Sequence, residues 1–478
     1  MSEALVPHVL TESVRGRADR LWRAWSGPPW ERAARYAAIA ACALLFLHAA
    51  ATFEIVYTIR VSHLLLLVAC AVGAPFIFYG WRRLPEFVRW AALGLLAVYL
   101  LATALADTTV LPSEGRSSAY RSWVYLADLV FGLAVVGLFS GLWGRGESLR
   151  TLCWALVAGA GIGAAYGIYQ WFAQRYGLPL EDVNNAVNTD GITRGDVPLG
   201  FGAGLFGGER VRGTFVEPHF FAIYLASMLP FAAALAYRRD RWIGWAIAAV
   251  LAIGVALALT SSASAWAALA GGAVTGTALV AISRGFVRVA AVAGAVLVVG
   301  CLLVAVFLSN PEDLGSATGR SGSELATTTE FRVDTWDRVV DIWSARPVIG
   351  FGPGQGAVKL ATRLPGWATE DRPRPLVLGT AEGQWSASLL DGGVLAFSAW
   401  CLFLGAILYV GGRAVVRRPA PLVVAAFVAA MTAVLGSLVG GDRLDLRVWV
   451  LLGLLAAVGC NAHSNRNEGD GKPHERAA

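Results

Sequence analysis

The chain has 478 residues, of which 56% are hydrophobic and 15% charged, and its formal net charge is +6. Soluble domains carry about 25% charged residues, so this composition and a mean hydropathy of +0.58 exclude an ordinary soluble protein. The basic residues stand between apolar blocks, so membrane topology explains the positive charge better than nucleic-acid binding does.

About twelve apolar blocks are long enough to cross a bilayer, which requires about 20 residues. Backbone groups in lipid must be hydrogen-bonded within the segment, and the blocks lack the period-two alternation of barrel strands. The sequence therefore predicts an all-α polytopic membrane protein. Its spans are expected at about 36–53, 61–80, 88–106, 122–143, 149–172, 219–237, 241–260, 262–282, 287–308, 385–410, 420–439 and 445–460.

Three segments are expected along the chain: a basic cytoplasmic arm at 1–35, a single transmembrane domain at 36–460 and a disordered cytoplasmic tail at 461–478. Arginines fill the arm and recur in every second loop, and such residues favour the cytoplasmic side. Because an even number of spans returns the chain to the same side, both termini are predicted to be cytoplasmic. The loop arginines are Arg82, Arg83, Arg145, Arg150, Arg238, Arg239, Arg241, Arg284, Arg288, Arg413, Arg417 and Arg418.

Two long loops, at about 173–218 and 309–384, then fall outside the cytoplasm. Loops of more than about 15 residues are usually functional or disordered. The second loop has the pattern of an amphipathic helix at 330–343. Because Trp is favoured at the lipid–water boundary, this helix is expected to lie on the membrane surface. The apolar residues on its one face are Val333, Trp336, Val340 and Trp343.

Each long loop contains a glycine cluster. Residues 202–207 (GAGLFG) match G-x-G-x-x-G, but a dinucleotide site needs that turn between a strand and a helix, so a flexible turn is the better interpretation. Residues 350–356 (GFGPGQG) lack the G-K-[ST] ending of a phosphate loop. They favour a tight turn that lets backbone approach another group, and the alternative is a row of N–H groups around an anionic ligand.

Charged residues lie where the long loops enter the spans. Arg210, Arg212 and Glu217 precede the sixth span and are either interface anchors or ligand contacts. A carboxylate such as Glu217 is favoured by the dipole at a helix N-terminus. His219 is either a proton shuttle or an interfacial side chain.

The second loop and the tenth span carry further candidates. Asp334 and Arg338 are four residues apart and can pair on a helix face, which leaves Arg332 for a ligand. Arginine suits a diphosphate because its planar fork binds oxyanions bidentately and stays charged. Glu382 lies just before the tenth span. Asp391 lies inside it, where an acid is costly, and is either functional or a hydrogen-bonding partner of a neighbouring helix.

At these residues the sequence resembles the O-antigen ligase and O-antigen polymerase superfamily, over roughly residues 150–410. Residues 212–222 (RGTFVEPHFFA) are similar to the family's R-x-x-G-T-F/P-N-x-F-A. Residues 332–336 and 347–354 resemble R-x-x-x-W... P-x-x-G-x-G-x-G. Residues 382–393 (EGQWSASLLDGG) resemble H-N-x-Y-L-x-x-L-x-E-x-G. Order, spacing and membrane context agree for all three segments.

The chain departs from that pattern at three places. Glu382-Gly383 stands where ligases often carry His-Asn, His219 replaces Asn, and Ser262-Ala263 stands where related members have Ser-Arg. These differences leave both a polymerase-like member and a divergent ligase open.

The resemblance implies glycan transfer at a bacterial cytoplasmic membrane, on its outer side. The donor would be linked to undecaprenyl diphosphate and the acceptor would be a lipid-linked glycan or a lipid core, with no metal and no cofactor. At the matched positions, Arg212 and Arg332 are expected to stabilise the leaving diphosphate, and Glu382 to act as the base. The residues expected to bind substrate are Arg210, Arg338, Glu217, His219, Trp336 and Asp391.

Two other classes remain open on the sequence. One is a multi-pass transporter or flippase of a small anion or a lipid-linked glycan, which requires polar residues at mid-membrane and often has inverted repeats. The sequence has few charged residues in the middle of its apolar blocks and no clear inverted repeat. A non-catalytic assembly factor of a polysaccharide export complex is the other alternative.

Overall fold

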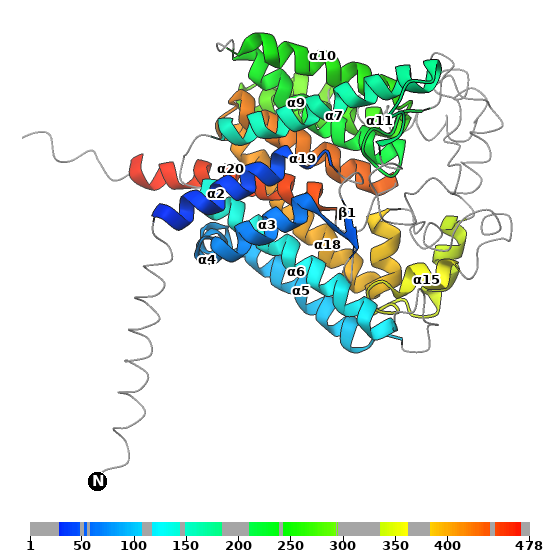
Figure 1. Cartoon of the computed structure of the whole chain (residues 1–478). Coiled ribbons are helices and arrows are strands. Elements are labelled where there is room, and N and C mark those ends of the chain that lie inside the picture. The colour runs from blue at the N-terminus through cyan, green and yellow to red at the C-terminus, as the bar shows by residue number, and fades with distance from the viewer. Residues whose placement is uncertain are drawn as a thin grey trace, which may run out of the picture.

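A computed structural model of the chain gives a bundle of helices with one short hairpin (Figure 1). It describes residues 28–47, 52–54, 58–107, 117–143, 149–183, 210–238, 242–292, 294, 335–361, 383–439 and 445–469. The helices are α2 (Pro28–Ala43), α3 (Val61–Val72), α4 (Ala74–Arg83), α5 (Glu86–Ala104), α6 (Ser118–Trp143), α7 (Arg150–Tyr176), α9 (Pro218–Tyr237), α10 (Ile243–Leu259), α11 (Ala263–Ser283), α15 (Gln355–Ala361), α18 (Gln384–Arg417), α19 (Pro421–Val439) and α20 (Leu446–Gly469).

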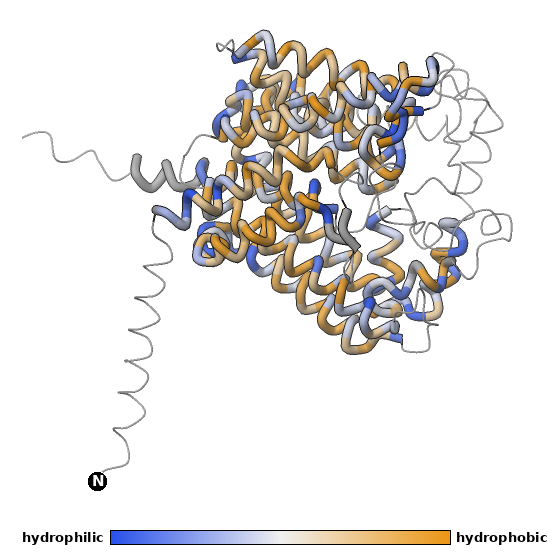
Figure 2. The backbone as a smooth tube through the Cα atoms, in the orientation of Figure 1, coloured by the Kyte–Doolittle hydropathy of each residue, from blue (hydrophilic) through white to orange (hydrophobic). Residues whose placement is uncertain are grey.

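The helical membrane class is confirmed. Within the described ranges, seven helices are long and apolar enough to cross a membrane, or eight if the bent pair α3 and α4 is one span. Ile243–Leu259 and Leu446–Asn461 are shorter apolar helices. Figure 2 shows hydrophobic residues along the helices and hydrophilic ones gathered towards their ends. The count of twelve stays a prediction, and most of the expected span 287–308 lies outside the described residues.

The predicted first span, 36–53, has the wrong bounds. Helix α2 begins at Pro28, because proline is well suited to the first position of a helix, and it ends at Ala43. Thr52–Glu54 forms strand β1, which pairs antiparallel with β2, Thr58–Arg60. The β-branched and aromatic residues of this segment favour extended chain, which apolar length alone does not reveal.

The predicted second span, 61–80, is a bent pair of helices. Helices α3 and α4 meet at Gly73 with an angle of 81° between them. A side chain at Gly73 would lie 2.6 Å from Leu138 Cδ1 of α6 and 2.7 Å from the Ala69 carbonyl oxygen, so a larger residue would force these groups to shift. Pro75 stands in the first turn of α4, where its missing N–H removes no helical hydrogen bond.

The bundle has two chemically different ends. Helices α9, α18 and α20 begin at one of them, which we call the loop end, and Arg447 in α20 reaches the carbonyl of Phe220 in α9 there. Helices α9, α11 and α18 finish at the other, basic end, where Arg35 of α2 also donates to Leu142 O of α6 over 2.7 Å. The arginines at the ends of α4, α9, α11 and α18 are Arg82, Arg83, Arg238, Arg284 and Arg417.

The amphipathic segment of the second loop is helical over residues 335–344, and residues 330–334 lie outside the described ones. Its Val339 and Ile342 are buried against Phe351 and α15 in a small separate core. Trp336 and Val340 point away from this core and are 40% and 48% exposed. An exposed face of this kind suits a membrane surface, and the location there stays a prediction.

Candidate functional site

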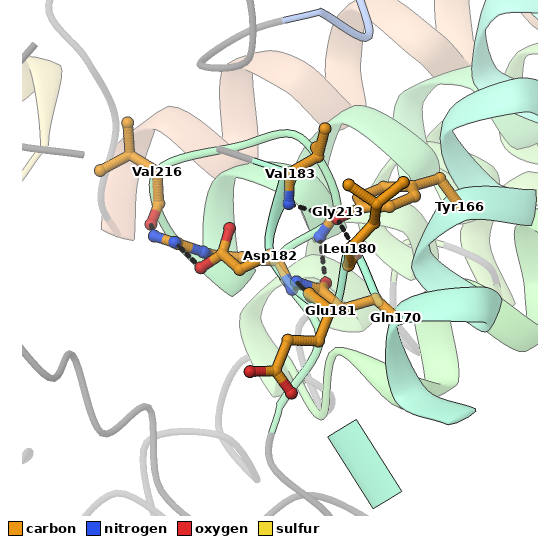
Figure 3. A network of polar contacts seen from close by, with 9 residues as sticks. Tyr166, Gln170, Leu180, Glu181, Asp182, Val183, Gly213 and Val216 are labelled. Atoms are coloured by element: carbon orange, nitrogen blue, oxygen red, sulfur yellow. Dashed lines mark hydrogen bonds and ion pairs between the residues drawn. The ribbon is translucent and has the colours of Figure 1, made fainter. Parts of the chain in front are cut away.

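A polar face near the end of α7 binds the chain that follows it (Figure 3). Tyr166, Tyr169 and Gln170 are three and four residues apart, so their side chains share one face of the helix. The Tyr166 hydroxyl donates to Leu180 O and accepts from the N–H of Val183. Gln170 Nε2 donates to Glu181 O over 3.0 Å, and Tyr169 donates to Pro179 O. Residues 179–183 are thereby held against α7.

The same Gln170 also fixes the segment that carries Arg212. Its Oε1 accepts the N–H groups of Arg212, at 3.1 Å, and Gly213, at 2.8 Å. Gln170 is fully buried, so one side chain ties two loop segments to α7. Figure 3 shows it between Glu181 and Gly213. Gly213 has a φ of +56°, and a side chain there would lie 2.8 Å from the Phe221 ring, so the turn requires glycine.

Arg212 is buried and held at two points. Its Nη1 donates to Val216 O over 3.2 Å, and its Nη2 forms an ion pair with Asp182. The arginine side chain is 6% exposed and that of Asp182 is 22% exposed. The guanidinium is therefore fixed in a largely water-free place, with its anionic partner on the side nearer to water. Arg210 lies beside it in the chain and donates through Nε to Thr260 O over 2.9 Å.

Glu217 and His219 stand at the beginning of α9. Glu217 is the N-cap residue, with extended backbone and no side-chain capping hydrogen bond. His219 Nδ1 lies 3.0 Å from the hydroxyl of Ser264 in α11, which lies 3.2 Å from that of Ser262. The structure thus gathers Arg210, Arg212, Glu217 and His219 around one helix start at the loop end. Their catalytic and binding roles stay predictions.

A buried ion pair that the sequence analysis did not single out supports this helix start from α20. Arg447 and Asp445 are 8% and 6% exposed. The Asp445 carboxylate accepts from the N–H and Nε of Arg447 and forms the ion pair with its Nη2. Arg447 Nη1 donates to Phe220 O over 2.8 Å, and its guanidinium lies 4.9 Å from the centre of the Phe215 ring.

The second glycine cluster docks into a break in α18. Non-helical torsions at Gly392 and Gly393 interrupt this helix. The exposed backbone groups pair with the cluster: the N–H groups of Phe351 and Gly352 donate to Leu390 O and Asp391 O, and that of Val394 donates to Pro347 O. A side chain at Gly350 would lie 2.6 Å from the Asp391 carbonyl carbon. Of the two interpretations of residues 350–356, this contact supports close backbone approach.

Asp391 completes that docking. It is 3% exposed, and its Oδ1 accepts the N–H of Gly356 at the start of α15. A second acid, Asp107, forms an ion pair with Lys359 of α15 over 2.9 Å. Both contacts hold α15 on the bundle and favour the hydrogen-bonding interpretation of Asp391. Its contact with substrate stays a prediction.

Replacing Gly393 with alanine is expected to lower the stability of the fold by about 3 kcal/mol or more, because its φ of +64° and ψ of −160° suit glycine alone. A side chain there would also lie 2.4 Å from the carbonyl carbon of Val348. Thermal unfolding of the purified protein in detergent measures the effect. Gly405→Ala in the same helix is the control, since nothing lies within 4 Å of that position. An equal melting temperature for the two variants would contradict the docking.

Residues 212–215 form a turn closed by the hydrogen bond from Phe215 N–H to Arg212 O, which we call the Arg212 turn. The described contacts do not join the remaining sequence candidates to this turn. Trp336 and Arg338 lie on the helix 335–344. Four sequence candidates lie outside the described residues: Glu382, Arg332, the segment 202–207 and Asp334, the residue expected to pair with Arg338. The described chain resumes at Gly383, the N-cap of α18, whose backbone lies against the carbonyls of Ser437 and Leu438 at the end of α19.

Among the described residues, no three His, Cys, Asp or Glu side chains gather as metal ligands do. The expectation of metal independence stays a prediction. The fixed guanidinium of Arg212 is suited to stabilising negative charge, because such interactions are strongest where water is excluded.

A comparison with protein families matches residues 247–401 to the family described as O-Antigen ligase. The match begins in α10, includes the glycine cluster and Asp391, and ends in α18. The Arg212 turn lies before it. No curated protein matches the chain.

Proposed function

We propose that this chain, a member of the O-antigen ligase and O-antigen polymerase superfamily, transfers a glycan from an undecaprenyl-diphosphate-linked donor to a lipid-linked glycan or a lipid core. The reaction takes place on the outer side of a bacterial cytoplasmic membrane. The family match and the apolar helices support a multi-pass membrane enzyme that transfers glycosyl groups. The buried, fixed guanidinium of Arg212 at the loop end is the observation that supports the chemistry.

The charge distribution supports the side of the membrane. The helix connections at the basic end carry Arg238, Arg417 and Arg418, whereas the short connection 260–262 between α10 and α11 at the loop end has no basic residue. Short loops rich in arginine remain in the cytoplasm. The loop end, with Arg212, is therefore extracytoplasmic, where the sugar of a translocated lipid-linked donor is available.

The chemistry follows from the leaving group. When the glycosidic bond breaks, negative charge develops on the diphosphate. Arg212 and Arg332 stabilise this charge. Arg210 and Arg338 are the next candidates for the same role. The acceptor hydroxyl loses its proton to Glu382, which acts as the general base. No metal is needed, because the diphosphate is already a good leaving group.

The test uses the purified protein in lipid nanodiscs with a lipid-linked donor and acceptor. We expect release of undecaprenyl diphosphate together with a longer glycan. A size profile of the host's lipid-linked and surface glycans after gene deletion separates the two activities. Single repeat units without long chains indicate a polymerase, and long chains stranded on the carrier indicate a ligase. An unchanged profile, with no second copy of the gene, would contradict glycan transfer and favour the transporter.

Asp182→Asn is expected to lower the KM for the donor about fivefold, since Asp182 competes with the diphosphate for Arg212 through a partly exposed ion pair worth about 1 kcal/mol. Glu181→Gln is the matched control. It removes the same charge one residue away, and the exposed Glu181 carboxylate points away from the network (Figure 3). A raised KM in Asp182→Asn alone would show that Asp182 orients Arg212 instead.

A further inference from the structure

The last helix that the structure describes, α20, reaches the turn that carries Arg212. Helix α20 begins at Leu446, more than 200 positions after Arg212, and its second residue is Arg447. Arg447 is bonded to Phe220 O in the first turn of α9 and packs over the Phe215 ring. Both contacted residues belong to the segment 212–222. This segment is therefore fixed from two sides, by Gln170 of α7 and by Arg447 of α20.

The contact with Phe215 reaches the middle of the turn. Phe215 is fully buried, and its ring centre lies 5.3 Å from those of Phe221 and Tyr224 in α9. Its N–H donates to Arg212 O over 3.0 Å. The backbone of Phe215 is thus bonded directly to that of Arg212. The guanidinium plane above the ring and the bond to Phe220 O together set where the turn lies relative to α9.

Asp445 makes Arg447 a rigid support. Three donors of Arg447, its N–H, Nε and Nη2, meet this one carboxylate. Lysine has a single ammonium on a flexible stem and cannot reproduce a fork bound to a carboxylate, a carbonyl and a ring together. Such a pair, more than nine-tenths buried, is costly to retain in an apolar bundle unless its geometry is satisfied.

We propose that Arg447, oriented by Asp445, is a positioning residue for glycan transfer that acts through Arg212. Arg447 holds the Phe215 ring and the first turn of α9, and these hold Arg212 where the diphosphate charge develops. The inference rests on the proposed function. A displacement of about 1 Å at a catalytic group can lower the rate about 100-fold, so an effect through position alone is measurable.

The experiment compares Arg447→Lys, Arg212→Lys and the double variant as purified protein in nanodiscs. We expect Arg447→Lys to lower kcat about 100-fold with less than a threefold change in the donor KM, because the proposed role acts through Arg212 and not through a contact between Arg447 and the donor. In the Arg212→Lys background the same change is expected to cost less than twofold, since the residue through which it acts is already impaired. Hydrogen exchange of residues 212–222 is expected to rise, while that of α7 stays unchanged.

Removing one partner of a buried pair can prevent folding, so Asp445→Asn combined with Arg447→Met is the second variant, which leaves no unpaired charge. It is expected to be folded, with the same loss of kcat. Full activity of either Arg447 variant, or losses that multiply in the Arg212→Lys background, would overturn the positioning role and leave the proposed function intact. Full activity of Arg212→Lys would instead overturn the role of Arg212, and with it this inference.

Discussion

Arg212→Lys is expected to lower kcat for glycan transfer about 100-fold, and Arg212→Ala up to about 1000-fold, because a fixed donor to developing charge is worth factors of this size. Lysine keeps the charge but cannot hold Val216 O and an oxyanion in one planar fork. The measurement is the rate of undecaprenyl diphosphate release at saturating donor. The KM is expected to change less, since the charge develops mainly in the transition state.

Both Arg212 variants are expected to fold. Asp182 is 22% exposed, so its carboxylate regains water when the arginine is removed, and the N–H bonds to Gln170 do not depend on the side chain. This sets Arg212 apart from Arg447, whose partner is buried. Arg175→Ala is the matched control: Arg175 is an exposed arginine in the last turn of α7, packed over Trp171. An equal loss in that control would show that positive charge at this end of the bundle, and not Arg212, supports activity.

The bounds of several helices could be predicted closely from the sequence because a long apolar stretch is a strong signal. Helices α9, α10 and α19 begin and end within two residues of the expected positions. The first span was wrong in its bounds: helix α2 begins at Pro28 and ends at Ala43, and Thr52 and Phe53, which the expected span included, belong to strand β1. The bend at Gly73 also left no mark in hydropathy, since it depends on the approach of α6.

The glycine cluster shows where local sequence stops being sufficient. Residues 350–356 predicted a tight turn with close backbone approach, but the partner, the break at Gly392 and Gly393, lies some forty positions further along the chain. Gln170 and Asp182 were beyond prediction for the same reason. A glutamine and an aspartate near a helix end are ordinary, and only the fold brings Arg212 to them.

Asp445 and Arg447 could have been found. An acid inside a span is costly and is therefore a functional candidate, as Asp391 is. The span expected at 445–460 contains Asp445 and Arg447, two opposite charges two positions apart. The structure buries both and joins them. The same rule, applied to Asp445, identifies the pair from the sequence. Its contacts with Phe220 and Phe215 can be found only in the folded structure.

The second large effect is expected at Glu382. Glu382→Gln keeps the size of the side chain but cannot accept the proton of the acceptor hydroxyl, and general-base catalysis contributes about 100-fold to 10,000-fold. A loss of this size in kcat, with the donor KM unchanged, is therefore the expected result. The pH dependence of kcat/KM is the sharper measurement. A base must be ionised to act, so the parent protein is expected to lose rate at low pH, and this acid limb is expected to vanish in Glu382→Gln.

Gly383, the residue that follows Glu382, must not be changed together with it. Gly383 has a φ of +92°, and a side chain there would lie 2.7 Å from Leu438 O, so Gly383 variants would disturb α18 and α19 together. Glu181→Gln, a charge-matched change at an exposed position, is the better control. If Glu382→Gln and Glu382→Ala are present at normal levels and keep full activity with an unchanged acid limb, Glu382 is not the base. His219, half-buried at the start of α9 and bonded to Ser264, is then the residue to replace next, because an imidazole can also accept a proton.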